Sequence, residues 1–457
     1  MQNIFLLISI ILYLCAPKEY SYSFCIINLI IFFLSIGLFY KNGGKLVSFT
    51  TFFSLSFFFV NFAYPVFIYP YDPHYILQFR YHFREIYINK GTALSLMAIE
   101  AYLTAIKQTK SHPFISIKTY KLRIQNITFI KGLYLITFGY LCWKIIPQIG
   151  ISYGDVEIPF QAGSLFVIIA SVLLIVACYK YDSVIKNNPK GFFLKTRFSL
   201  ILSSLFMIIS SVLGSREYVI SLGLLFLLVF SIFVKKIKTK IFVSGIVVAV
   251  IGLYAFSILR SGQSFTVESI TQNQAYQKSD VNPLWNTVTD LLINNRNLYV
   301  GIEYADDASH GYTYGYHYIP TLFAPLPFVP DFISKTFLGK PAVSFTSQEI
   351  LTNYTRGDFG HSELDYELGS NCVVDVYIAW GMIGVLLMFY LLGILIKNLE
   401  KKMRYDMYSL LTYSILFGTS VFMCRGSFFG PFRSVIWGLA ILYFCIGLSV
   451  KKKTIAS

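Results

Sequence analysis

The stretch 372-CVVDVYIAWGMIGVLLMFYLLGILI-396 decides the fold class of this chain, because its 25 residues are almost continuously apolar and carry one charge, Asp375. A helix of that length, at about 1.5 Å per residue, crosses the roughly 30 Å hydrocarbon core of a bilayer. Runs of similar character lie near residues 2–16, 22–40, 46–70, 91–106, 126–146, 161–178, 198–214, 218–234, 241–259, 406–424 and 434–450. We therefore expect an all-α polytopic membrane protein with about twelve transmembrane helices.

The composition excludes a soluble enzyme. Of 457 residues, 55% are hydrophobic and only 13% are charged, against roughly 25% in average chains. The net charge of +15 sits mostly in short loops, so it does not point to nucleic acid. The seven cysteines fall in or beside apolar runs, and no nucleotide-binding or metal-ligand motif is present. We expect no disulfide framework, no metal and no cofactor.

Lysine and arginine in the loops predict the orientation. Positively charged loops stay on the cytoplasmic side, and 23 of the 38 basic residues lie in every second loop. These loops are 41–45, 107–123, 180–197, 235–240, 397–404 and 451–453. The alternation fits twelve spans with both termini in the cytoplasm, and the first apolar run is interpreted as a retained helix and not a signal peptide.

One long loop separates the ninth and tenth spans. The pattern divides the chain into residues 1–259 with nine spans, a loop over 260–371, and residues 372–457 with three spans and a cytoplasmic C-terminus. The alternation places the loop on the outer face. Its twelve acidic residues against six basic ones invert the charge of the rest of the chain. Its prolines and its aromatic run 312-YTYGYHY-318 predict a partly helical cap resting on the membrane.

Arginine residues occur at the predicted outer ends of several spans, against the positive-inside bias. They are Arg80, Arg84, Arg216, Arg260, Arg425 and Arg433. Because guanidinium groups stay charged and fork onto phosphate oxygens, a converging set predicts a cradle for a diphosphate at the membrane surface. The alternative is that each arginine reaches lipid phosphates or pairs with a carboxylate of the loop.

Acid–base candidates cluster at the end of the loop, in 356-RGDFGHSELDYELG-369. Asp358, His361 and Glu363 lie within six residues, and Asp365 and Glu367 continue the alternation of carboxylates. A fixed carboxylate or imidazole near arginine suits removal of a proton from a sugar hydroxyl. The alternative is an acidic rim that keeps the cap soluble. Further candidates are Asp375, which is costly inside a span, and Glu217, which we interpret as an ion-pair partner of Arg216. His310 and His317 are left unassigned.

The layout resembles the Wzy-type O-antigen polymerases and related oligosaccharide repeat-unit polymerases. The resemblance rests on the large loop late in the chain and on the turn 214-GSRE-217 between two spans. It rests also on the proline-punctuated stretch 319-IPTLFAPLPFVPDF-332, followed by Gly339, Lys340 and Pro341, and on the re-entry 369-GSNCVVDVYIAWGMIGVLLMFYLLG-393. The similarity of layout covers nearly the whole chain, whereas the residue match is confined to these segments.

The resemblance implies an inner-membrane glycosyltransferase of the GT-C type. Such an enzyme moves a growing glycan from undecaprenyl diphosphate to the non-reducing sugar of another undecaprenyl-diphosphate-linked repeat unit, on the periplasmic face. Arg216 matches the family's GSR turn and would hold the diphosphate, and Arg260, Arg425 and Arg433 join it because of their expected membrane depth. The family also implies a partner that regulates chain length.

Two other functions remain open. A flippase for lipid-linked oligosaccharides shares the basic, aromatic, many-span character, but it binds its ligand between related halves and has little use for a large outer cap. An O-antigen ligase shares the architecture and the donor but uses a different acceptor. The bilayer is a partner in all three cases.

Overall fold

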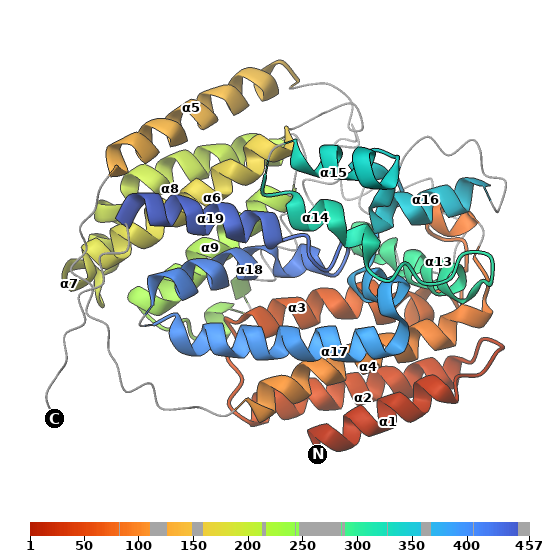
Figure 1. Cartoon of the computed structure of the whole chain (residues 1–457). Coiled ribbons are helices and arrows are strands. Elements are labelled where there is room, and N and C mark those ends of the chain that lie inside the picture. Colours follow the sequence, from red (N-terminus) through yellow and green to blue (C-terminus); the bar gives the residue numbers. More distant parts are fainter. Residues whose placement is uncertain are drawn as a thin grey trace, which may run out of the picture.

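The computed structural model describes residues 1–81, 83–109, 126–148, 159–212, 216–242, 244–245, 285, 288–326, 328–357, 367–404 and 406–446, and within these ranges it is all helical with no strand. Figure 1 shows long helices running side by side, with short helices of residues 289–357 gathered at one end, which we call the loop end.

Eleven of the twelve predicted spans coincide with helices, and the ninth, 241–259, lies almost wholly outside the described residues. The helices are α1 (Gln2–Leu14), α2 (Tyr22–Lys41), α3 (Phe49–Phe58) with the π-helix Phe59–Ile68, α4 (Ile86–Gln108), α5 (Ile127–Ile145), α6 (Phe160–Lys180), α8 (Pro189–Val212), α9 (Arg216–Phe233), α17 (Cys372–Lys402), α18 (Met407–Met423) and α19 (Phe432–Ile446). Seven of these segments are long and apolar enough to cross a membrane, and α1, α18 and α19 are shorter apolar helices. A polytopic membrane protein is confirmed, and the count of twelve stays a prediction.

Helix α4 explains why hydropathy alone undercounts the bundle. It carries Lys90 and Glu100, yet nearly all of its residues from Ile88 to Ile106 are buried, because α1, α2 and α17 surround it. A helix covered by protein does not need a lipid-compatible surface. Gly393 lets α17 approach α4 closely, since a Cβ at this position would collide with the backbone oxygen of Tyr102.

A second group of helices consists of α5, α6, α8, α9, α18 and α19, and the short α7 (Asp182–Ile185) joins α6 to α8. Helices α9 and α18 approach closely enough for the Ser221 hydroxyl to donate a hydrogen bond to the carbonyl of Gly418 at 3.1 Å. Helix α18 also packs on α3 and α17, which joins this group to the helices around α4. Small residues permit such backbone approach inside membranes.

The loop region packs onto the bundle. It comprises α12 (Thr289–Leu292), α13 (Asn294–Asp306), the 3-10 turns Tyr316–Tyr318 and Ala342–Phe345, α14 (Ile319–Phe323), α15 (Val329–Leu338) and α16 (Ser347–Gly357). Helix α13 is buried against α4 and α17. The predicted boundaries at residues 259/260 and 371/372 stay a prediction.

A buried amide network fixes this docking. Asn371 caps α17 by accepting from the Val373 N–H at 2.9 Å, and its amide donates to the Asn61 side-chain oxygen at 2.9 Å. Asn295 of α13 donates to the Asn61 carbonyl at 3.1 Å; Pro65, four residues further on, has no N–H to occupy that carbonyl. The cap, α17 and the π-helix are thus joined by one network of buried amide hydrogen bonds.

Helix α17 bends sharply after its second turn. Trp380 (φ −140°) and Gly381 (φ 63°, ψ −156°) leave the helical region. Only glycine adopts that backbone conformation readily, and Tyr312 packs against the position at 3.1 Å from where a Cβ would be. The bend separates residues 372–379, which belong to the loop end, from the long remainder of the helix.

Candidate functional site

A cavity of about 320 Å³ opens among α6, α9, α18 and α19 at the loop end. Its mouth is formed by the turn between α18 and α19, residues 425–431, and by Gln348 of α16. Its wall mixes small polar side chains, among them Ser171, Ser221 and Ser414, with apolar ones such as Leu225 and Phe422. The cavity therefore offers both hydrogen-bonding and apolar surface at the loop end.

Arg425 lines this cavity. Its guanidinium carbon lies 5.9 Å from the Phe422 ring centroid, and Glu217, which also lines the cavity, interacts with it electrostatically. The structure therefore gives Glu217 a partner, Arg425, that the sequence did not indicate. The side chain of Arg425 is partly buried, and a guanidinium held in such a place is suited to bind an anion bidentately.

Two more of the predicted arginines surround the same cavity. Arg216 begins α9 beside Glu217. Arg433 interacts electrostatically with the cavity residue Tyr218, and its guanidinium stacks on Trp437 with 5.4 Å between guanidinium carbon and ring centroid. Tyr218 approaches Gly163 so closely that a Cβ there would overlap its ring.

The N-termini of α9 and α19 add to the positive potential. Glu217 at the start of α9 lines the cavity, as do Pro431 and Ser434 at the start of α19. The N-terminal end of a helix carries a partial positive charge, and phosphate groups bind there readily. Together with Arg425, the two helix ends make an anion the best-matched ligand class for this cavity.

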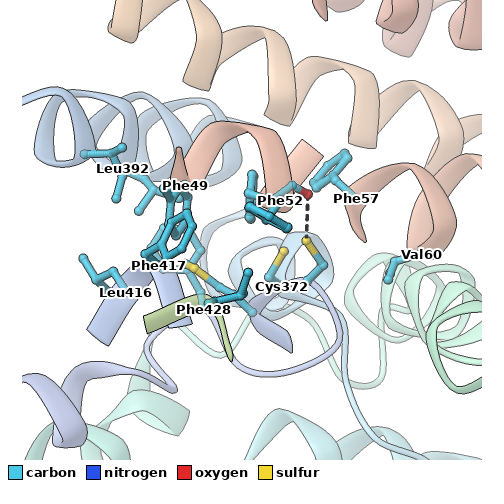
Figure 2. Close-up of a cluster of buried hydrophobic side chains, with 14 of the residues drawn as sticks. Phe49, Phe52, Phe57, Val60, Cys372, Leu392, Leu416, Phe417 and Phe428 are labelled. Atoms are coloured by element: carbon cyan, nitrogen blue, oxygen red, sulfur yellow. Dashed lines mark hydrogen bonds between the residues drawn. The ribbon is translucent and has the colours of Figure 1, made fainter. Parts of the chain in front are cut away.

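Asp375 anchors the turn that carries Arg425. Its Oδ2 accepts hydrogen bonds from the Phe428 N–H at 2.8 Å and from the Ser427 hydroxyl at 3.1 Å. The Cys372 N–H donates to the Cys424 carbonyl at 3.2 Å, so α17 holds the turn at two points. Figure 2 shows Phe428 and Cys372 among the buried apolar side chains of α3, α17 and α18. The predicted cost of this carboxylate is offset by these bonds.

His317 of the cap completes the surroundings of Asp375. Its Nε2 lies 3.5 Å from Asp375 Oδ1, and both side chains are fully buried. The Thr313 hydroxyl donates to the Ile378 carbonyl at 3.1 Å, so it accepts from His317 Nδ1 at 2.7 Å. Burial and the charge of Asp375 raise the pKa of the neighbouring Tyr318 hydroxyl, which keeps it protonated. The aromatic run thus contributes a support for the cavity.

The predicted acid–base residues Asp358, His361 and Glu363 lie outside the described residues, as does Arg260. The described residue that follows them, Glu367, accepts a hydrogen bond from Gln348, a cavity residue. Burial and then the charge of Glu349 raise the pKa of Glu367 above its ordinary value, against the lowering effect of Arg356. A carboxylate with a raised pKa at the edge of a cavity is suited to accept a proton.

Of the other arginines, Arg84 does not join this site. Its Nε pairs with Glu303 of α13 at 2.7 Å, so for this residue the alternative of a loop carboxylate partner is the correct one. Arg80 ends the 3-10 turn Leu77–Arg80 and is exposed. Sequence reasoning missed His317 and Gln348. Both reach the site across long sequence separations, which no local pattern reveals.

Comparison with known proteins gives one clear match. The family model for the O-antigen polysaccharide polymerase Wzy aligns with residues 1–454. No curated protein and no solved structure matches the chain. Because the family model covers nearly the whole length, the chain belongs to the O-antigen polysaccharide polymerase Wzy family.

Proposed function

We propose that this membrane polymerase transfers a growing glycan from undecaprenyl diphosphate to the non-reducing end of another undecaprenyl-diphosphate-linked repeat unit, on the periplasmic face. Family membership supports a glycosyltransferase-type polymerase with a lipid-linked oligosaccharide substrate. The predicted orientation supports an inner-membrane location with both termini in the cytoplasm and the loop end in the periplasm.

The observation that carries the proposal is Arg425 on the wall of the cavity, near the N-termini of α9 and α19. A diphosphate has the charge and the oxygen geometry that this arrangement matches. Arg216 and Arg433 flank the cavity and Arg260 joins the proposed set from the sequence. The cavity volume of about 320 Å³ accommodates a headgroup, and the lipid tail would remain in the bilayer.

In the proposed step, the acceptor hydroxyl oxygen attacks the anomeric carbon of the donor sugar. The bond between that carbon and the diphosphate oxygen breaks, and the diphosphate leaves with the electron pair. Arg425 and its neighbours stabilise the charge that develops on the leaving oxygen, where preorganised donors lower the barrier most. The proton of the hydroxyl passes to a base.

The base is proposed from the segment that follows α16. Asp358, His361 and Glu363 are the sequence candidates, and Glu367 is added because it contacts the cavity residue Gln348. Asp375 and His317 are positioning residues, since they are fully buried and act through the turn at 425–431. A chain-length regulator is proposed as a partner on the basis of the family alone.

The experiment compares surface polysaccharide on gels from a deletion strain complemented with wild type, Arg425→Ala, Arg216→Ala or Arg197→Ala. Arg197 is the matched control, since it is an exposed arginine of α8 outside the cavity lining. We expect the deletion, Arg425→Ala and Arg216→Ala to give core plus a single repeat unit, and Arg197→Ala to give the full ladder.

The same gels separate the rival functions. A flippase or a ligase predicts loss of the single-unit band in the deletion strain, because export or attachment then fails before polymerisation matters. A full ladder from Arg425→Ala at normal protein level would contradict the assignment of the diphosphate site while leaving the family activity intact.

A further inference from the structure

Helices α14 and α15 form a hairpin whose tip is strongly apolar and is left exposed by the part of the chain that the structure describes. The tip reads 324-APLPFV-329, and the chain turns there from α14 into α15. Leu326 is 53% exposed and Phe328 is 90% exposed. Along α15, Phe332 and Phe337 are also exposed, whereas Ser334 faces inward and is buried. Water is a poor environment for so many large apolar side chains.

The backbone at Phe328 adds to the observation. Its φ of 65° lies in the left-handed region, which is costly for a bulky side chain. The residue caps the start of α15 in this conformation and points a nearly fully exposed ring away from the protein. Backbone strain and exposure together indicate a contact that the described residues do not supply.

The position of the tip identifies that contact. The Trp437 indole N–H donates to the Pro325 carbonyl at 2.8 Å, and α14 packs on α19 (Figure 1). Trp437 is the sixth residue of α19, about 7 Å along the axis from the start of the helix. The tip therefore lies beside a membrane helix and not above its end. Tryptophan is also the residue most typical of the bilayer interface.

Exposed apolar side chains of α19 begin next to the residue that contacts the tip. Ile436, next to Trp437, is 37% exposed on α19, and Tyr443 and Phe444 continue that exposed face toward the other end of the helix. Such residues on a membrane helix face lipid acyl chains. The hairpin extends this face at the loop end.

We propose that the α14–α15 hairpin inserts its tip into the bilayer leaflet at the loop end. Leu326 and Phe328 lie in the acyl region, Phe332 lies at the headgroup boundary, and Phe337 lies outside the acyl region. Interfacial elements of this type bury apolar side chains at the headgroup and acyl boundary. The hairpin thereby ties the cap to the membrane beside the cavity mouth, independently of the cavity's own ligand.

The test measures depth with a fluorophore. Among the seven cysteines only Cys15 and Cys142 are not buried, so Cys15→Ser with Cys142→Ser gives a background of buried thiols. Single variants Phe328→Cys, Phe332→Cys and Phe337→Cys are labelled with the environment-sensitive dye NBD. Asn353→Cys on the exposed surface of α16 is the aqueous control. The full chain is placed in nanodiscs of phosphatidylethanolamine and phosphatidylglycerol.

Two quenchers then report position. We expect lipid carrying a nitroxide on its acyl chain near the headgroup to quench the label at 328 at least about twofold more than at 353, with 332 and 337 in between. Aqueous iodide should quench in the reverse order. Leu326→Cys repeats the measurement if Phe328→Cys does not accumulate.

Two outcomes would overturn the proposal. Equal quenching by iodide at 328 and 353, with no lipid quenching at 328, would place the tip in water. Protection of 328 from both quenchers would show that protein covers the tip, and a second copy of the chain would then be the occupant.

Discussion

Two arginines at the loop end, Arg296 and Arg425, have opposite surroundings. Arg296 of α13 is fully buried, donates to Thr355 at 3.2 Å and lies over the Tyr81 ring, with Glu303 close enough to interact electrostatically. Arg425 lies on a cavity wall, with Glu217 as its electrostatic partner. Both are cations at the loop end, but Arg296 is enclosed by protein whereas Arg425 lines a cavity.

The difference separates structural from ligand-binding charge. Around Arg296 the protein supplies the counter-ion, which is Glu303. The same carboxylate also pairs with Arg84 at 2.7 Å. Among the described residues that line the cavity, Arg425 and Glu217 are the charged ones, and the N-termini of α9 and α19 add positive potential. A guanidinium and two helix N-termini beside a cavity favour an anionic ligand. Each prediction below alters one side of this comparison.

The largest effect is expected from Arg296→Met, which should lower the free energy of unfolding by about 3–5 kcal/mol, because it leaves Glu303 buried with less compensation. Burial already raises the pKa of Glu303, and the charges of Arg84 and Arg296 oppose that rise. Without Arg296 the pKa of Glu303 rises further. The charged form of Glu303 then destabilises the protein at pH values above that pKa, and the loss of stability shrinks as the pH falls through it. Thermal unfolding in detergent at several pH values measures this, with Arg197→Met as control.

Arg425→Ala should cost less stability than Arg296→Met, because Arg425 is only partly buried, although Glu217 loses its electrostatic partner. It should reduce polymerisation about 10²–10³-fold, as expected for removal of one charge-stabilising donor. Arg425→Lys should recover part of the activity, because it restores the charge without the bidentate geometry. Polymer formation in membrane vesicles is the measurement. A matching loss of thermal stability would mean that Arg425 is structural, as Arg296 is.

Asp375→Asn should cost about 1–3 kcal/mol of stability, because it weakens a buried acceptor and leaves His317 without its anionic partner. Activity should fall with it, since the turn of Arg425 loses its anchor. Ser427→Ala, which removes one of the two bonds to Oδ2, should show the same changes at smaller size. If Asp375→Asn left activity unchanged, the hydrogen bonds from Asp375 to the turn would not be needed for the function of the site.

The smallest effect is a shift in pH dependence from Glu349→Gln. The charge of Glu349 raises the pKa of Glu367, and Glu349 also pairs with Arg356, which lowers it. Replacing Glu349 removes a charge that raises this pKa and also releases Arg356, whose charge lowers it. Both effects lower the pKa of Glu367. If Glu367 must be deprotonated to act, the acidic limb of the activity profile moves to lower pH, by less than about one unit. An unmoved limb would exclude Glu367 as the base.

The membrane class of the fold was predictable because apolar runs report burial in lipid or protein directly. Helix α4 was also found, although Glu100 and Lys90 make it less apolar than its neighbours. What the pattern could not supply was the shape of α17. Its 31 residues read as one span, but the bend at Trp380 and Gly381 is visible only in the backbone.

Part of the candidate site could be proposed from the sequence. Arg216, Arg425 and Arg433 were proposed from their places at helix ends; the structure puts Arg425 on the cavity wall and the other two beside Glu217 and Tyr218, which line it. Their role in binding a diphosphate stays a prediction. The pairing of Glu217 with Arg425 and of Asp375 with His317 was not predictable, since each joins distant segments. Charge sign follows from sequence, but the choice of partner depends on packing.

The bend at Gly381 lets one apolar segment do two different things. Hydropathy alone marks residues 372–396 as a single transmembrane segment. In the folded chain, Asn371 and Asp375 on the near side of the bend hold the cap and the Arg425 turn. The residues beyond the bend pack against α4 and α18, so a change in the angle at Gly381 would move the cap and the turn together relative to the bundle.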